Sequence, residues 1–200
     1  MKKLRFAFIL FFVFLISGCS DAKKYEVVLE GSSSSYYNWS CEIEDSSVLS
    51  IVDEQYFGKE SNDEILGLEG EYKFVFKPLK EGNTTVTFKY MRSWEEDDVL
   101  YEYVLKLNVD DKLKVTKVSE SGNYLSLEKI LTYDLEKLDL EKNFSEYKLI
   151  FDNNIVNIDG KECDFLTIYD YQDIIVGVFG ISKNENTIYK MIDGEMVIVE

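Results

Sequence analysis

The strictest pattern in the chain is an alternation of apolar and more polar residues toward the middle of the sequence. The apolar positions are Val99, Tyr101, Tyr103, Leu105, Leu107 and Val109. Successive side chains of a β-strand point to opposite faces, so a period of two places one apolar face against a core. The segment is therefore predicted to be a strand with one buried face.

Shorter stretches with the same tendency precede it. They lie at 25–29, 37–43, 48–52, 72–76 and 86–90. Pro78 ends or edges one strand, and Glu81-Gly82-Asn83 is a turn. Several short strands with no helical stretch between them predict a β-sandwich over residues 25–110.

The second half of the chain has a different pattern after Asp110-Asp111-Lys112, which is the expected boundary. Leucine and isoleucine recur at helical spacing from Leu127 to Leu138, behind Ser126 as a possible N-cap. Six apolar stretches follow, at 147–151, 154–158, 162–169, 174–182, 187–191 and 195–199. Asp159-Gly160 and Asp193-Gly194 are dipeptides of tight β-hairpins. Residues 111–200 are expected to form a small α+β domain, one helix on an antiparallel sheet, so that the whole chain is mainly β.

The N-terminus is typical of an export signal. Basic residues precede an apolar run from Phe6 to Ile16, which is too short to cross the roughly 30 Å core of a bilayer. Ile16-Ser17-Gly18-Cys19 resembles a bacterial lipobox, in which the cysteine receives a lipid. We expect a signal peptide over residues 1–18, a lipidated tether over 19–24, and a protein held on the outer side of the cell membrane through Cys19.

Composition excludes several classes of function. The net charge is −16, which opposes binding to nucleic acid. The chain has no histidine, which removes the Ser-His-Asp and Cys-His catalytic sets and the commonest zinc sites. We expect no enzyme activity, no metal and no cofactor. Cys41 and Cys163 could pair outside the cytoplasm, although two free thiols are the favoured interpretation.

Two segments between predicted strands have an unusual composition. The first is small and polar and then abruptly aromatic: Ser32, Ser33, Ser34, Ser35, Tyr36 and Tyr37. The second, Arg92-Ser93-Trp94, places a cation beside an indole. Binding residues concentrate in loops on rigid scaffolds, and Trp, Tyr and Arg are enriched at interface hot spots. Both segments are therefore candidate binding loops.

The stretch from Phe74 to Glu95, with these loops, resembles the chagasin family of inhibitors of papain-like cysteine proteases. Its members have an immunoglobulin-like β-sandwich and an Arg-Pro-Trp loop, which Arg92-Ser93-Trp94 matches with Ser in place of Pro. Gly67-Leu68-Glu69-Gly70 matches the family's Gly-x-x-Gly loop. The serine-rich segment, followed by Trp39, stands where the family has Asn-Pro-Thr-Thr-Gly-Tyr, with Tyr36 at the position of Gly.

The resemblance implies a reversible protein inhibitor, expected to be a monomer, that blocks a protease cleft with three loops at one end of the sandwich. The residues it assigns to protease binding are Ser32, Ser33, Ser34, Ser35, Tyr36, Tyr37, Gly67, Gly70, Arg92, Ser93 and Trp94. Small residues such as Ser33–Ser35 would let backbone approach the catalytic cysteine of the protease. Trp94 would lie against an aromatic rim of the protease.

Two other functions stay open at this point. The same sandwich could be a surface recognition or adhesion module that inhibits nothing. The acidic residues of the second half could also form a carboxylate site of an enzyme; they are Asp152, Asp159, Asp164, Asp170 and Asp173. The chain lacks the phosphate-binding and calcium-binding loops that would support this last alternative.

Overall fold

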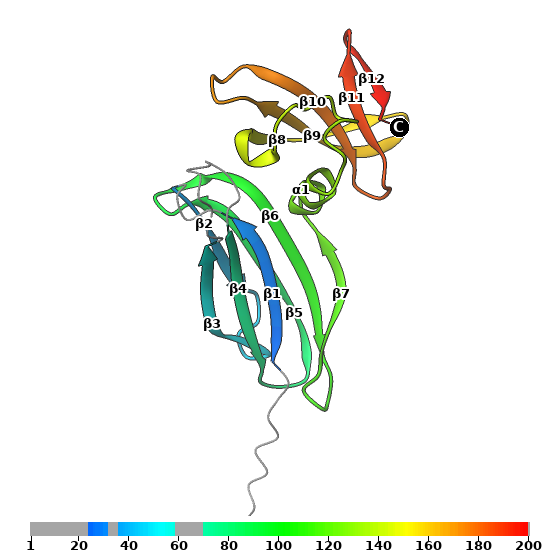
Figure 1. The fold of residues 1–200 in the computed structure, drawn as a ribbon. Coiled ribbons are helices and arrows are strands. Elements are labelled where there is room, and N and C mark those ends of the chain that lie inside the picture. Colours follow the sequence, from blue (N-terminus) through cyan, green and yellow to red (C-terminus); the bar gives the residue numbers. More distant parts are fainter. Residues whose placement is uncertain (1–23, 32–35, 59–69, 200) are drawn as a thin grey trace, which may run out of the picture.

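The computed structural model describes residues 24–31, 36–58 and 70–199. These residues form a mainly β protein with one α-helix, and all pairings among the described strands are antiparallel. Two sheets make up the first half and one sheet makes up the second (Figure 1). The mainly β prediction with one helix is therefore confirmed.

The two N-terminal sheets hold the strands expected from the alternating pattern. Sheet A joins β1 (Tyr25–Gly31), β4 (Gly70–Pro78) and β3 (Leu49–Gly58), in that order. Sheet B joins β2 (Tyr37–Ile43), β5 (Gly82–Arg92), β6 (Glu95–Val109) and β7 (Val115–Ser121). We call these two sheets the sandwich.

The sandwich core lies between the facing sides of the two sheets. Phe74 and Phe76 of β4 pack edge-on against Phe88 of β5, with ring centroids 5.0 and 6.1 Å apart. On β6, Tyr101 and Leu105 are buried as the alternation predicted. Edge-to-face rings suit the spacing of roughly 10 Å between packed sheets.

Strand β7 lies beyond the boundary expected at residues 110–112. It pairs with β6 from Val115↔Val109 to Ser121↔Val104, so sheet B continues past that boundary. The strand was not predicted because only its first residue is partly buried and the others are exposed, which leaves no apolar alternation to detect. Where one domain ends and the next begins stays a prediction.

The helix differs from its prediction. Helix α1 spans Tyr124–Leu131 with Asn123 at its N-cap position, so Ser126 is not the cap and the helix does not reach Leu138. Ser126 is instead buried in the helix, where its hydroxyl donates to Asp164. Leu138 is fully buried from a turn after the helix. Leucines of the helix and of the following turn are buried in the same core. Their spacing in the sequence therefore resembles that of one long helix, although the helix ends at Leu131.

Sheet C forms the second half with α1 and a short 3-10 helix, Phe144–Glu146. Its order is β12 (Glu195–Ile198), β11 (Ile188–Ile192), β10 (Ile175–Ser182), β9 (Lys161–Tyr169) and β8 (Lys148–Ile158). We call α1 and sheet C the C-terminal unit. The stretches expected at 147–151 and 154–158 form one strand, β8, with an irregularity between Phe151 and Ile155.

The two predicted hairpin turns are confirmed. Asp159 and Gly160 have φ of 52° and 80°, and Asp193 and Gly194 have φ of 52° and 88°. Two positive φ values in succession are the geometry of a type I′ turn, which suits the twist of the strands it joins. Asp and Gly adopt this left-handed conformation at low cost.

Cys41 of β2 and Cys163 of β9 are free thiols, the first half-buried and the second buried. Burial raises the pKa of the Cys41 thiol to about 12. Within the described part of the chain, no helix has the length and apolar character needed to span a bilayer. The predicted signal peptide and Cys19 lie outside the described residues.

Candidate functional site

The strand ends that flank the predicted loops meet at one end of the sandwich. In sheet A, Gly70 pairs with both Gly31 and Gly58, so the chain leaves β1 and β3 and enters β4 at the same level. In sheet B, Tyr37 begins β2 opposite Arg92, the last residue of β5. We call this the loop end.

Contacts across the core show that both sheets present the same end. The indole of Trp39 in β2 donates to the Glu30 carbonyl of β1 at 2.8 Å. The Tyr72 hydroxyl of β4 donates to the Asn38 side-chain oxygen of β2 at 2.9 Å. The residues next to Gly31 and Gly70 therefore lie against the residues next to Tyr37, and the connections at 31–37, 58–70 and 92–95 all depart from the loop end.

The Arg92-Ser93-Trp94 motif forms a hairpin between β5 and β6. Arg92 pairs with Glu95, which leaves Ser93 and Trp94 as a two-residue turn. The next pair is Met91↔Val99, so three residues of β6 bulge out of the ladder. A bulge re-aims side chains near the end of a strand, and here it returns the Asp98 carboxylate toward Arg92.

An exposed aromatic pair connects the two candidate loops. Tyr36 and Trp94 meet edge to face with ring centroids 5.9 Å apart, although 58 positions separate them in the sequence. Tyr36 is 74% exposed and Trp94 is 65% exposed. Two large rings that touch each other and solvent form an apolar surface suited to a protein partner.

Tyr37 and Arg92, which lie next to the two loops in the sequence, form a cluster with Asp98. The Tyr37 hydroxyl donates to Asp98 at 2.5 Å, and the Arg92 guanidinium lies 4.8 Å from the centre of the Tyr37 ring. Arg92 also forms ion pairs with Glu95 and Asp98, each at 3.2 Å. The hydrogen bond to Glu95 raises the pKa of Arg92, while burial and the bond to Asp98 raise the pKa of Tyr37 to about 12. At neutral pH Tyr37 therefore stays a donor and Arg92 stays charged.

Glycine at Gly31 and Gly70 is required by aromatic neighbours. A Cβ at Gly31 would lie 3.0 Å from the Tyr72 ring and 3.1 Å from the Trp39 indole nitrogen. A Cβ at Gly70 would collide with the ring of Tyr56. Both glycines are buried, and they allow aromatic rings to close the core directly beneath the loop end.

The structure brings together part of the predicted set. Tyr36, Ser93 and Trp94 are exposed at the loop end, while Tyr37 and Arg92 are partly buried and contact each other. Gly70 lies at the same end as the first residue of β4. The predicted residues Ser32, Ser33, Ser34, Ser35 and Gly67 lie outside the described residues.

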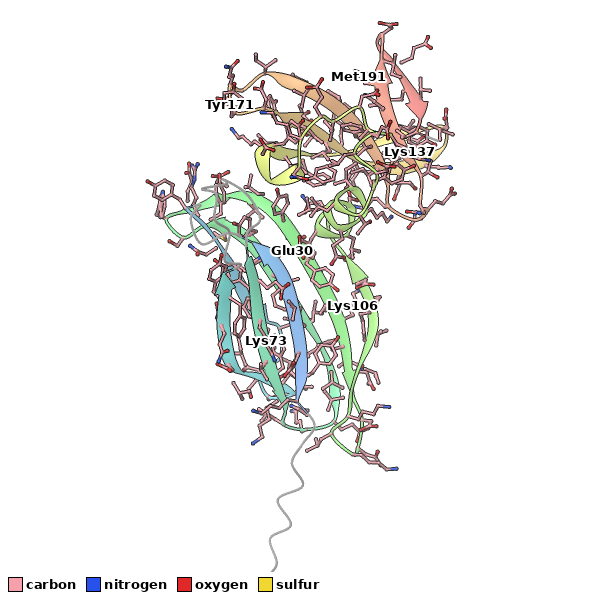
Figure 2. The ribbon with its side chains drawn as sticks, in the orientation of Figure 1. Glu30, Lys73, Lys106, Lys137, Tyr171 and Met191 are labelled. Carbon is pink, nitrogen blue, oxygen red and sulfur yellow. The ribbon has the colours of Figure 1, made fainter. Side chains whose placement is uncertain are left out.

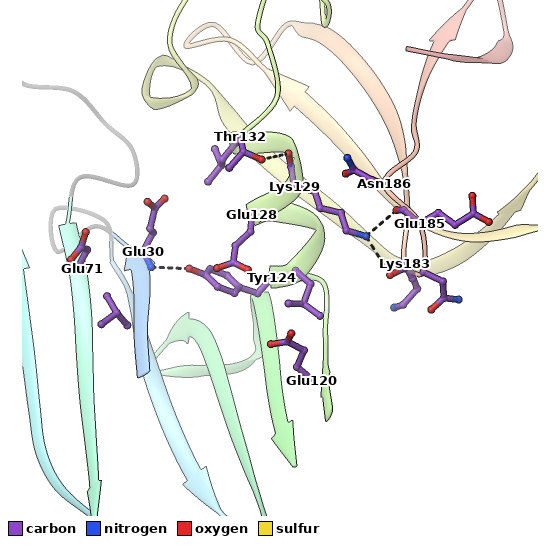
Figure 3. A pocket seen from close by; sticks show the side chains of 14 residues that line it. Glu30, Glu71, Glu120, Tyr124, Glu128, Lys129, Thr132, Lys183, Glu185 and Asn186 are labelled. Atoms are coloured by element: carbon purple, nitrogen blue, oxygen red, sulfur yellow. Dashed lines mark hydrogen bonds between the residues drawn. The ribbon is translucent and has the colours of Figure 1, made fainter. Parts of the chain in front are cut away.

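A cleft of about 1000 Å³ separates the sandwich from the C-terminal unit (Figure 3). Glu30, Glu71 and Glu120 of the sandwich and Glu128 of α1 line it. Burial, followed by the charges of Glu120 and Glu30, raises the pKa of Glu128. Lys129, also of α1, donates to the carbonyls of Ser182, Lys183 and Glu185 at 2.6, 3.3 and 3.2 Å. The hydrogen bonds of this lysine therefore hold α1 against the β10–β11 turn.

The acidic residues considered as a catalytic set have separate structural contacts. Asp164 is buried against Ser126 and Lys183, Asp170 accepts backbone N–H bonds in the β9–β10 turn, and Asp173 pairs with Lys148. Asp152 accepts from Asn154, and Asp159 forms a hairpin turn. Over the described ranges, no group of three or more Cys, Asp or Glu residues could hold a metal ion.

Sequence reasoning missed Asp98, which binds two of the predicted residues. The available signal was the acidic run Glu95-Glu96-Asp97-Asp98, which directly follows the Arg-Ser-Trp motif. Strict alternation places Asp98 on the face opposite Val99 but does not say which residue it meets. The bulge between Glu95 and Val99 directs the Asp98 carboxylate toward Arg92 and Tyr37, and a bulge cannot be read from residue spacing.

Comparison with known proteins bears on the first half of the chain. Residues 20–109 match the model of the chagasin family peptidase inhibitor I42. The crystal structure of a cysteine protease inhibitor from Entamoeba histolytica is 22% identical, with 42% of this chain and 75% of that chain covered and a TM-score of 0.35. No curated protein matches the chain.

Proposed function

We propose that this protein blocks the active-site cleft of papain-like cysteine proteases with the loop end of its sandwich, because residues 20–109 match the model of the chagasin family peptidase inhibitor I42. The face-to-face packing of sheets A and B supports the immunoglobulin-like fold that the resemblance implies. We propose further that a lipid on Cys19 holds the protein on the outer side of the membrane.

The observation that carries this proposal is the exposed pair of Tyr36 and Trp94. Each ring could bury on the order of 150–250 Å² against a partner. The edge-to-face contact restrains each ring against the other before a partner binds. Such restraint lowers the conformational entropy lost on association, which favours affinity.

Inhibition by this surface needs no chemistry on the inhibitor. The serine-rich segment would bring small residues, and with them backbone, near the catalytic cysteine of the protease. Trp94 would cover the rim of the protease cleft, and Tyr36 would extend that contact from the first loop. Arg92 already pairs with two carboxylates of β6, so we expect it to stabilise the Arg-Ser-Trp hairpin rather than to offer a free charge to the protease.

The first described strand begins at the end of the sandwich opposite the loop end. Tyr25, the first residue of β1, pairs with Phe76, whereas Gly31 pairs with Gly70 at the loop end. Seven strand residues at about 3.3 Å each separate the two ends by roughly 20 Å. A lipid on Cys19 would therefore leave the loop end directed away from the membrane, accessible to a protease in solution.

The test is inhibition of papain by the mature protein, with Cys19→Ser to keep it soluble. We expect reversible inhibition that Trp94→Ala weakens about thirtyfold, or about 2 kcal/mol, because the variant removes the larger ring of the pair. Val118→Ala is the matched control, since Val118 is also exposed but lies on β7. This control should inhibit like the unaltered protein.

Two outcomes would contradict the proposal. Equal inhibition by the Trp94→Ala variant would place the contact elsewhere on the molecule. Failure of the unaltered protein to inhibit papain-like proteases would leave the second candidate, a recognition module that uses the same exposed rings. A partner protein that the unaltered protein captures in a pull-down, and that the Trp94→Ala variant does not capture, would then support the recognition module.

A further inference from the structure

The C-terminal unit is fixed against the sandwich close to the loop end. The Tyr101 hydroxyl of β6 donates to the Leu149 carbonyl of β8 at 3.2 Å, and its ring meets Phe151 with centroids 6.1 Å apart. On the other side, the Tyr124 hydroxyl of α1 accepts the Glu30 backbone N–H at 2.9 Å. Figure 2 shows Glu30 at the end of the sandwich that faces sheet C.

Stacked rings lead from this junction to the candidate site. Tyr101 stacks on Tyr90 with centroids 5.6 Å apart, and Tyr90 stacks on Tyr37 at 5.8 Å. Tyr37 in turn contacts Arg92. The rings of Tyr101 and Tyr90 therefore connect sheet C to Tyr37, the residue that follows Tyr36 in the sequence.

The β9–β10 turn lies at the same end of sheet C as this junction. Lys148, next to Leu149, pairs with Tyr169, and Tyr169 pairs with Ile175. In the view of Figure 1, the β9–β10 hairpin and the β5–β6 hairpin extend to the same side of the molecule. The β11–β12 hairpin points away from the sandwich in that view.

This turn presents large apolar side chains in an ordered loop. Tyr171 is 75% exposed, and Ile174 and Ile175 are 55% and 56% exposed. The Asp170 carboxylate accepts the backbone N–H groups of Gln172 and Ile174 at 2.8 and 2.9 Å, which holds the loop closed. The ammonium of Lys142 lies 4.9 Å from the centre of the Tyr171 ring.

Apolar residues exposed on the same side of the molecule would add contact area to the loop end. A stable complex buries about 800 Å² on each partner, of which two aromatic rings supply on the order of 300–500 Å². We therefore propose, on the basis of the proposed function, that the β9–β10 turn is a second contact surface for the same protease. Tyr171 and Ile174 bind the protease surface beside its cleft while Tyr36 and Trp94 cover the cleft rim.

The experiment compares inhibition constants for papain using the mature Cys19→Ser protein. The double variant Tyr171→Ala/Ile174→Ser should raise the inhibition constant at least tenfold, because it removes both apolar contacts of the turn. Ile192→Ser is the matched control, since Ile192 is 48% exposed on the β11–β12 hairpin. It should change the inhibition constant less than twofold.

Hydrogen exchange in the complex with papain supplies an independent measurement. We expect the amides of residues 170–175 to gain protection on binding, and those of the β11–β12 turn to stay unchanged. Unaltered inhibition by the double variant, while Trp94→Ala still weakens inhibition, would overturn the second surface and leave the proposed function standing. Absence of inhibition by the unaltered protein would overturn both.

Discussion

The sandwich and the C-terminal unit have cores of different chemistry. The sandwich interior is filled by rings such as Phe74, Phe76 and Phe88. The C-terminal unit buries mainly aliphatic side chains together with Ser126, Asp164 and Ser182. Among the described residues that are both buried and polar, only Thr84 lies in the sandwich.

The difference follows from what each sheet packs against. Two facing sheets leave a gap that aromatic rings from both sides can fill. Sheet C has a helix of eight residues as its cover, and a helix of that length is not stable without tertiary contacts. The buried contacts of Asp164 and Lys129 hold α1 on sheet C, whereas ring packing holds the sandwich together.

The largest effect should follow from breaking the aromatic core of the sandwich. Phe88→Ala removes a fully buried ring that packs against Phe74, Phe76 and Tyr103. We expect a loss of about 3–5 kcal/mol in the free energy of unfolding, measured by urea denaturation. Lys106→Ala, an exposed position of β6, should change it by less than about 0.5 kcal/mol. A loss below about 1 kcal/mol for Phe88→Ala would show that the rings do not dominate this core.

A smaller effect should follow from breaking the polar contacts of the C-terminal unit. Asp164→Ala leaves Ser126 and Lys183 without the carboxylate that they bind at 2.7 and 3.2 Å. We expect a loss of about 2–3 kcal/mol, because hydrogen bonds to a buried charge are among the stronger ones. In this variant the amide hydrogen-exchange rates of α1 should increase more than those of β5.

The exposed residue Asp152 provides the control for that variant. Asp152→Ala removes an acidic side chain of the same unit that, within the described ranges, accepts hydrogen bonds from Asn154. It should leave the exchange of α1 unchanged. Equal exchange of α1 in both variants would contradict the fastening role of Asp164.

The smallest effect concerns the junction of the two regions and depends on pH. Burial and the neighbouring carboxylates raise the pKa of Glu128, so the folded state holds its proton to higher pH than the unfolded state does. Stability is therefore lost as pH rises through the unfolded and then the folded pKa of Glu128. Glu128→Gln should stabilise the protein by a few tenths of a kcal/mol at pH 7 and have no effect near pH 3.

Denaturation at both pH values measures this difference. Glu162→Gln, an exposed position on β9, controls for the removal of one negative charge from an acidic chain. A gain of the same size in both variants would assign the effect to net charge. A gain for Glu128→Gln that persists at pH 3 would contradict the titration argument.

Much of the fold could be predicted because strands with one buried face leave a regular pattern. The alternation of β6 and the Asp-Gly turns of sheet C are local features that one short segment fixes. Strand β7 could not be predicted, since it is held by hydrogen bonds to β6 and buries little apolar surface. The helix was misplaced because leucines from two separate segments meet in one core.

The candidate site divides in the same way. The sequence by itself determined the Arg-Ser-Trp motif, the serine-rich segment and the turn that exposes Trp94, because each depends on residues close together in the chain. Only the tertiary structure decided that Tyr36 meets Trp94, that Asp98 binds Arg92 and Tyr37, and that sheet C packs against Tyr101. These contacts depend on strand register, on a bulge and on packing between sheets, and none of those is encoded in local spacing.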